Sequence, residues 1–274
     1  MNICIFGSGA IGSYIGALLH KNKINVSLIC RGNHLKAIKN KGLLMQSAKS
    51  NEEYFCKPEA SDNPNDFKKQ DVVIVTLKAH SAALTAKMLS PLLKENTMVV
   101  SAVNGLPWWY FYKSNDKFEN FKLKSVDPKN LQWDYIKPER AMGCVVYPAA
   151  EIKKPGFVYH MEGNRFPIGE PSGEISDRAK NLSYILIESG LKSPVRKNIR
   201  SDIWMKLWGN LAFNPISALT GETLEDIANN KKSCATVRKM MIEGQNVAEA
   251  LGIKFSISLE KRIDGTRKVG AHKT

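Results

Sequence analysis

Residues 2–12 read NICIFGSGAIG, an apolar run that passes directly into Gly7, Gly9 and Gly12 at G-x-G-x-x-G spacing. Residues 11–20 have a helical pattern, so the glycines stand between a predicted strand and a predicted helix. Glycine lets the backbone approach a pyrophosphate, and the helix offers its N-terminal N–H groups and the positive end of its dipole. The stretch predicts a binding turn for a nicotinamide or flavin nucleotide. Its expected cofactor-binding residues are Gly7, Ser8, Gly9, Ala10, Ile11 and Gly12.

Arg31 follows the second predicted strand, residues 25–30, and bears on which cofactor binds. Proteins that prefer NAD usually have Asp or Glu near this point, where it binds the ribose 2′-hydroxyl, and the sequence has Arg31-Gly32-Asn33-His34 instead. A guanidinium can bind a 2′-phosphate through charge-assisted hydrogen bonds of about 1.5–3 kcal/mol each. Arg31 therefore favours NADP(H); the alternative is that it merely ends a strand on a basic surface.

The composition of the chain limits the kinds of protein that it can be. A chain of 274 residues with 43% apolar content suits two domains of a soluble globular protein. The formal charge of +14 comes from scattered lysines with no basic tail or patch, so we expect anionic small molecules rather than nucleic acid as partners. The five cysteines show no C-x-x-C pair and no metal-ligand spacing with the histidines, and no signal peptide or transmembrane run is visible. We expect no metal, no membrane partner and a cytoplasmic location.

Two further buried strands are predicted at residues 71–77 and 97–101, with a helix at residues 82–93 between them. Strands that alternate with helices indicate an α/β fold with a Rossmann-like, doubly wound parallel sheet. Lys78 follows the first of these strands and Asn104 follows the second, where ligands bind in such sheets. The alternatives are an exposed loop lysine and an ordinary turn.

Residues 108–138 depart from this alternation, because aromatic residues and lysines are mixed there. We interpret them as an insertion packed on the domain surface or at a subunit contact, rather than as a nucleic-acid surface. Short strands at residues 141–147, 156–160 and 166–169 would complete the sheet, and a helix at residues 176–189 would cover it. The dinucleotide-binding domain is thus expected to span residues 1–195.

Residues 196–274 have an all-helical pattern. We expect a helix at residues 203–212 with Ser201 as its N-cap, ended or kinked by Pro215, and further helices at 222–229, 233–251 and 256–269 with Gly252 as a C-cap.

Lys206, Asn210 and Asn214 share one face of the first of these helices. Their spacing of four residues places them within an arc of roughly 80°, over about 12 Å of axial rise. A small keto acid could contact neighbouring members of this row. Alternatively, Lys206 is solvated and Asn214 caps the helix before Pro215.

Residues 199–220, IRSDIWMKLWGNLAFNPISALT, resemble the signature of the ketopantoate reductases, the 2-dehydropantoate 2-reductases. The resemblance covers essentially the whole chain, and four shorter motifs share it. They are the Gly7–Gly12 turn, TLKA at 76–79, Asn104-Gly105 and YPAA at 147–150, with Pro155-Gly156 also similar. The reaction that the resemblance implies is the NADPH-dependent reduction of 2-dehydropantoate to pantoate, on the route to pantothenate and coenzyme A.

The resemblance also implies residue roles. Arg31 would hold the 2′-phosphate, and Lys78, Asn104 and Ala150 would contact NADPH. Lys206 would be the catalytic proton donor and a substrate contact. Asn210 and Asn214 would orient the substrate, with Asn104 nearby.

The family continues past the GAHKT motif at residues 270–274 into segments that contact substrate and cofactor, and this chain stops at Thr274. We therefore expect a truncated helical domain with exposed apolar surface, and hence either a homodimer contact that covers this surface or poor stability. Two alternatives to ketopantoate reduction remain. One is reduction of another 2-keto acid or an imine; the other is nucleotide binding with little turnover.

Overall fold

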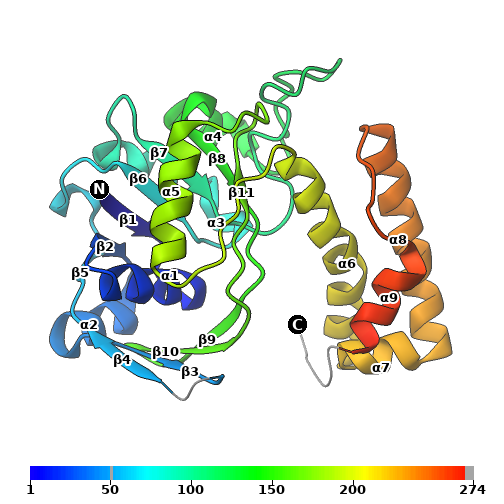
Figure 1. Cartoon of the computed structure of the whole chain (residues 1–274), viewed down its shortest axis with the longest axis horizontal. Helices are drawn as coiled ribbons and strands as arrows, with labels where there is room; N and C mark the ends of the chain where they lie inside the picture. The colour runs from blue at the N-terminus through cyan, green and yellow to red at the C-terminus, as the bar shows by residue number, and fades with distance from the viewer. Residues whose placement is uncertain (50–51, 269–274) are drawn as a thin grey trace. The chain divides into compact units, whose positions relative to one another are not determined.

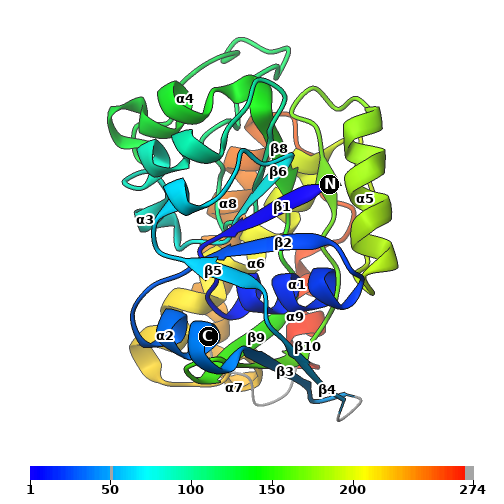
Figure 2. The same cartoon turned by 90° about the vertical axis from the view of Figure 1, so that its left-hand side faces the viewer.

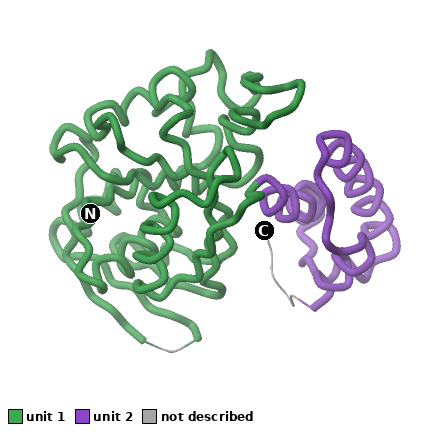
Figure 3. Tube along the Cα trace, turned by 45° about the horizontal axis from the view of Figure 1, so that its top comes forward, with its two compact units in different colours: residues 1–199 green, residues 200–274 purple. Residues whose placement is uncertain are grey.

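The computed structural model describes residues 1–49 and 52–268. The chain divides into two compact units, residues 1–199 and residues 200–274 (Figure 3). The motif at residues 270–274 lies outside the described residues.

The main sheet of the first unit has the strand order β11-β8-β7-β6-β1-β2-β5 (Figures 1 and 2). Its neighbouring strands pair in parallel, except that β11 is antiparallel to β8. The strands are β1 (Asn2–Phe6), β2 (Asn25–Ile29), β5 (Glu59–Ser61), β6 (Val72–Val75), β7 (Met98–Ser101), β8 (Ala141–Cys144) and β11 (Ile168–Gly169). The chain moves outward from β1 to β2 and β5 on one side and to β6, β7 and β8 on the other. This topological switch at β1 confirms the predicted doubly wound sheet.

The central strands are buried on both faces. Ile3, Val73 and Val99 have no exposed surface. Their β-branched side chains suit a sheet that is covered on both sides. Helices α1 (Ala10–Lys21), α2 (Gly32–Lys41) and α5 (Asp177–Glu188) contribute apolar residues to the core around this sheet.

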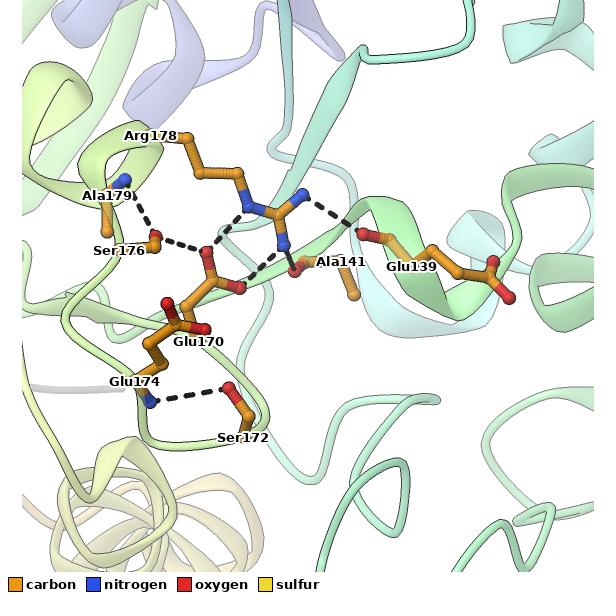
Figure 4. A network of polar contacts seen from close by, with 8 residues as sticks. All are labelled: Glu139, Ala141, Glu170, Ser172, Glu174, Ser176, Arg178 and Ala179. Atoms are coloured by element: carbon orange, nitrogen blue, oxygen red, sulfur yellow. Dashed lines mark hydrogen bonds and ion pairs between the residues drawn. The ribbon is translucent and has the colours of Figure 1, made fainter.

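A charged network attaches α5 to the edge of the sheet, as Figure 4 shows. The buried carboxylate of Glu170 accepts two hydrogen bonds from Arg178, at 2.6 and 2.5 Å, and a third from Ser176 at 2.6 Å. Arg178 also donates to the carbonyl oxygens of Glu139 and Ala141. The bonds with Glu170 raise the pKa of the Arg178 guanidinium. The network therefore satisfies a buried charge that would otherwise destabilise the fold.

A second sheet, with the order β4-β3-β10-β9, was not expected from the sequence. Its strands are β3 (Leu43–Ser47), β4 (Glu53–Cys56), β9 (Ala149–Lys154) and β10 (Phe157–Glu162). α1 packs on this sheet as well as on the main one, and Tyr14 stacks on His160 with ring centroids 4.2 Å apart. The expectation that residues 156–160 complete the main sheet is wrong. β10 pairs in parallel with β3, more than 100 residues earlier in the chain, a partner that local pattern cannot identify.

Residues 79–92 form no continuous helix, which corrects the helix expected at residues 82–93. The structure has a short α3 (Ala79–Ala82) and a 3₁₀ helix, η2 (Ala86–Leu92), that contains Pro91. Proline has no N–H to donate, so an α-helix is weakened at this point.

The segment 108–138 is also corrected in part. Trp108–Phe111 are buried, and the Trp109 indole N–H donates to Ser101 Oγ at 3.2 Å. The segment therefore begins inside the core of the unit rather than on its surface. It continues through η3 (Pro128–Asn130), α4 (Leu131–Ile136) and η4 (Pro138–Arg140), and the remaining 3₁₀ turn, η1 (Pro64–Asp66), lies earlier in the chain.

The second unit consists of α6 (Ile199–Thr220), α7 (Leu224–Asn229), α8 (Lys231–Ala250) and α9 (Leu259–Arg267). Ser201 is not an N-cap, because α6 begins at Ile199, and Pro215 does not end the helix. Proline costs a helix interior about 3 kcal/mol. Burial of Trp208 and Phe213 on the same helix offsets that cost.

Gly252 ends α8 as predicted. It has a φ of 77°, in the left-handed region. Its N–H donates to Glu249 O at 2.9 Å, and the N–H of Ile253 donates to Ala248 O at 3.0 Å. This pair of bonds is a Schellman motif.

Candidate functional site

The glycine turn connects β1 to α1 at the switch point of the main sheet. The N–H groups of Gly7 and Ser8 both donate to Ile29 O in β2, at 3.0 and 2.8 Å. The Thr76 hydroxyl at the end of β6 donates to Gly7 O at 2.8 Å. The two strands that flank β1 therefore hold the turn from both sides.

Each of the three glycines is required, or tolerated, for a different structural reason. Gly7 has a φ of +103°, and a Cβ there would lie 2.5 Å from Leu77 Cδ2. A Cβ on Gly12 would lie 2.5 Å from Thr76 Oγ1 and 2.8 Å from Gly7 O. A Cβ on Gly9 would have Gly7 O as its nearest atom, at 3.9 Å. Packing thus explains Gly7 and Gly12, whereas the space above Gly9 is open and fits a group that approaches the backbone closely.

Helices α1 and α2 begin at this edge of the sheet without a side-chain cap. Gly9 and Arg31 occupy their N-cap positions, and neither makes a side-chain capping bond in the described part of the chain. By contrast, α5 and α9 are each capped by a serine, Ser176 and Ser258. The N–H groups of an uncapped first turn lack acceptors within the helix and attract anions.

Three other predicted cofactor residues follow parallel strands on both sides of β1. Arg31 lies just beyond β2, Lys78 just beyond β6 and Asn104 just beyond β7. All three are exposed, and Gly105 after Asn104 has a φ of +92°. The fold thus brings these residues and the glycine turn to one edge of the main sheet, the edge at which parallel α/β sheets bind ligands.

Ala150 occupies a different place. It lies on β9 of the second sheet, opposite His160 of β10. It is half-buried and packs against the core beside α1. The position of Ala150 therefore depends on the second sheet rather than on the main sheet.

Asp62 was missed by the sequence analysis. It follows β5, the neighbour of β2, so its exposed carboxylate belongs to the same edge as Arg31. Burial raises the pKa of the Cys30 thiol to about 11, and the charge of Asp62 adds to that rise. Cys30 directly precedes Arg31, so an acidic group does lie near the end of β2. No local sequence signal marks it, because the parallel pairing of β2 and β5 brings it there.

Lys206, Asn210 and Asn214 lie on one continuous helix, since α6 runs through all three positions. Each side chain is half-buried. A cation followed by two amides at successive turns of a helix can hold a carboxylate or carbonyl oxygen and supply a proton to it.

Arg262 on α9 also approaches α6 and was not considered from the sequence. Its guanidinium lies over Gly209, where a Cβ would be 2.4 Å from Nη2. Gly209 stands between Lys206 and Asn210 in the chain, so a second cation lies beside the row.

Residues 1–49 and 52–268 contain no group of three or more His, Cys, Asp or Glu side chains arranged to hold a metal ion. They also contain no helix with the length and apolar character needed to cross a bilayer.

Two family profiles match the chain. The profile of the ketopantoate reductase PanE/ApbA matches residues 3–173, and that of the ketopantoate reductase PanE/ApbA C terminal matches residues 198–274.

Known proteins agree with these profiles. A 2-dehydropantoate 2-reductase from Mesorhizobium japonicum is 45% identical over all of this chain and 84% of its own length. One from Archaeoglobus fulgidus is 28% identical over 94% of this chain and 77% of its own length. A crystal structure of a candidate ketopantoate reductase from Ralstonia solanacearum MolK2 superimposes with a TM-score of 0.93. It is 33% identical and covers 98% of this chain and 83% of that one.

Proposed function

The chain belongs to the ketopantoate reductase family, and from that premise we propose that it reduces 2-dehydropantoate to pantoate with NADPH. The enzyme is an oxidoreductase that uses a nicotinamide cofactor. The proposed reaction is a step toward pantothenate. The 45% sequence identity to a 2-dehydropantoate 2-reductase over the full chain carries the proposal.

For the cofactor, we propose that the Gly7–Gly12 turn holds the pyrophosphate. The open space above Gly9 and the uncapped N-terminus of α1 support this role. Arg31 would bind the 2′-phosphate together with the uncapped N-terminus of α2. Lys78, Asn104 and Ala150 would complete the cofactor contacts.

The bound nicotinamide would supply the hydride that reduces the ketone carbon. We propose that Lys206 Nζ holds the ketone oxygen, stabilises the negative charge that develops there and donates a proton to it. Asn210, Asn214 and Asn104 would orient the substrate through hydrogen bonds. The first domain, residues 1–195, would thus bind the cofactor, and residues 196–274 would supply the catalytic side chains.

One observation favours NADH over NADPH as the cofactor. Asp62 provides the acidic group near the end of β2 that an NADH enzyme would use for the ribose hydroxyl. NADH is therefore the second candidate. It predicts tighter binding of NADH than of NADPH, the opposite of the result expected from Arg31.

A substrate panel tests the proposal. Oxidation of NADPH and of NADH is followed spectroscopically with 2-dehydropantoate, with other 2-keto acids and with an imine. We expect the highest kcat/KM for 2-dehydropantoate with NADPH. A higher kcat/KM for another keto acid or for an imine would show that 2-dehydropantoate is not the substrate. Tight cofactor binding without turnover on any compound would indicate a nucleotide-binding protein instead.

We also propose a cytoplasmic enzyme that forms a homodimer through its helical unit. Leu219, Ile242 and Val247 of that unit are 82%, 45% and 55% exposed, which supports an apolar contact there. Light scattering over a concentration series would reveal the dimer. A monomer at every concentration would contradict it.

A further inference from the structure

His34 stands three residues after Arg31 in the first turn of α2 and joins three segments that lie apart in the sequence. Its Nδ1 accepts a hydrogen bond from the Gly156 N–H, at 3.1 Å, in the turn between β9 and β10. Its Nε2 lies 3.0 Å from Ser13 Oγ, on the first turns of α1. The imidazole thus connects α2, α1 and the second sheet.

The partners define the tautomer of the ring. Nδ1 faces an N–H donor, so it must be the unprotonated nitrogen, and the proton of the neutral ring is on Nε2. Nε2–H then donates to Ser13 Oγ. The Ser13 hydroxyl lies 3.2 Å from Ser8 O, to which it donates, and 2.9 Å from Ser8 Oγ. A continuous chain of hydrogen bonds therefore runs from Gly156 through His34 to Ser8 of the glycine turn.

The contact between the β9–β10 turn and α2 is tight. Gly156 has a φ of +79°, and a Cβ there would lie 3.1 Å from Ala37 Cβ and 3.2 Å from Gly42 O. Ser8 and Ser13 are buried. The chain of hydrogen bonds consequently has little room to rearrange, and each of its members depends on its neighbours.

We propose that His34, in its neutral form, is a positioning residue for the dinucleotide: it holds the Ser8–Ser13 part of the glycine turn and the β9–β10 turn in one binding-competent arrangement. The inference rests on the proposed function for the identity of the ligand. It adds a link between the two cofactor-binding segments, because the β9–β10 turn follows the strand that carries Ala150.

Protonation would break this link. A second proton on Nδ1 would place a donor against the Gly156 N–H donor. The charged residues nearest to His34 along α2 are Arg31, the N-cap, and Lys36, and Lys154 lies next to the β9–β10 turn; the first turn of α1 carries no acidic residue. Burial lowers the pKa of His34 below its usual value of 6.5. The neutral, linked state is therefore present at neutral pH and is lost as the pH falls through that lowered pKa.

The test measures NADPH dissociation constants for the full-length protein by titration. His34→Ala and Ser13→Ala should each weaken binding about five- to tenfold, the effect of losing one hydrogen bond in the chain. The double variant should be no weaker than the poorer single variant, because both remove the same link. His20→Ala is the matched control, since His20 Nδ1 lies 3.0 Å from Tyr54 Oη and joins the other end of α1 to the same sheet. It should leave the dissociation constant unchanged.

A pH series separates positioning from folding. His34→Gln keeps an N–H donor toward Ser13 and stays neutral at every pH. After correction for the pH dependence that NADPH and the other groups give both proteins, its NADPH dissociation constant should be the same at low and neutral pH. The wild type should bind more weakly once the pH falls through the lowered pKa of His34. Identical pH profiles, additive losses in the double variant, or unchanged binding in His34→Ala would each overturn the inference. If the wild type binds NADH instead, the same series is run with NADH, and only the proposed cofactor is wrong. If it binds neither dinucleotide, both proposals fall.

Discussion

The strand-end edge of the first unit and the row on α6 are built from different parts of the chain. At the edge, the proposed ligand groups are backbone N–H groups and residues that directly follow β1, β2, β6 and β7. Hydrogen bonds from the glycine turn to its neighbouring strands determine their positions. On α6, the groups are side chains at successive turns of one helix, and rotamers decide where their polar atoms lie. Variants at the edge should therefore change cofactor binding, and variants in the row should change turnover.

The largest expected effect belongs to Lys206→Ala. Loss of the proton donor should lower kcat about 10²- to 10⁴-fold, because general acid catalysis typically contributes that much. The NADPH dissociation constant should stay the same. Steady-state assays and a cofactor titration measure the two quantities. Lys239→Ala, which removes an exposed lysine from α8, is the control. A turnover near that of the wild type would refute the division between binding and catalysis.

Arg31→Ala should have the next largest effect, this time on binding alone. Each charge-assisted bond lost to the 2′-phosphate should weaken NADPH binding about 10- to 150-fold, with NADH unaffected. Lys36→Ala removes the same charge from the exposed face of α2 and should change little. Equal losses for both cofactors would indicate that Arg31 has no special relation to the phosphate.

Two alanine substitutions within the glycine turn should separate folding from binding. Gly12→Ala should lower the free energy of unfolding by about 1–3 kcal/mol, because its Cβ would overlap Thr76 Oγ1 and Gly7 O. Gly9→Ala should leave that free energy unchanged, since its Cβ meets no atom closer than 3.9 Å, and should weaken cofactor binding. Chemical denaturation and cofactor titration measure both. Unchanged binding in Gly9→Ala would show that no ligand occupies the open space.

The smallest effect is expected from Asp62→Asn. Removing an exposed carboxylate near the 2′-phosphate should strengthen NADPH binding by about two- to fivefold, because solvent screens such charges. Glu59→Gln, on the opposite end of β5, is the matched control and should have no effect. A loss of NADH binding in Asp62→Asn, with NADPH binding weak in both proteins, would instead favour NADH as the cofactor.

Local signals predicted much of the fold. The run of apolar residues into Gly7, Gly9 and Gly12 marks β1, the turn and α1. Runs of β-branched residues mark β6 and β7, because such runs are typical of strands that are buried on both faces of a sheet. Gly252 is readable as a helix end because few other residues adopt its positive φ.

Other elements depend on partners that are distant in the sequence. The second sheet needs the pairing of β3 with β10, so its short and partly polar strands carry no clear pattern of their own. The aromatic residues Trp108–Phe111 look like a surface insertion until their burial is known. The helix around Pro215 continues because the packing of α6 outweighs a local helix breaker.

Sequence alone predicts the glycine turn as a dinucleotide site, and it gives the order of the main elements, the family and the periodic spacing of Lys206, Asn210 and Asn214. These features depend on chain direction, glycine geometry and helical periodicity, which are local. Three features come from the folded structure instead: Gly9 alone among the three glycines faces open space, Asp62 shares an edge with Arg31, and His34 joins the glycine turn to the second sheet. Strand pairing and helix packing produce these juxtapositions, and they act between residues that the sequence keeps far apart.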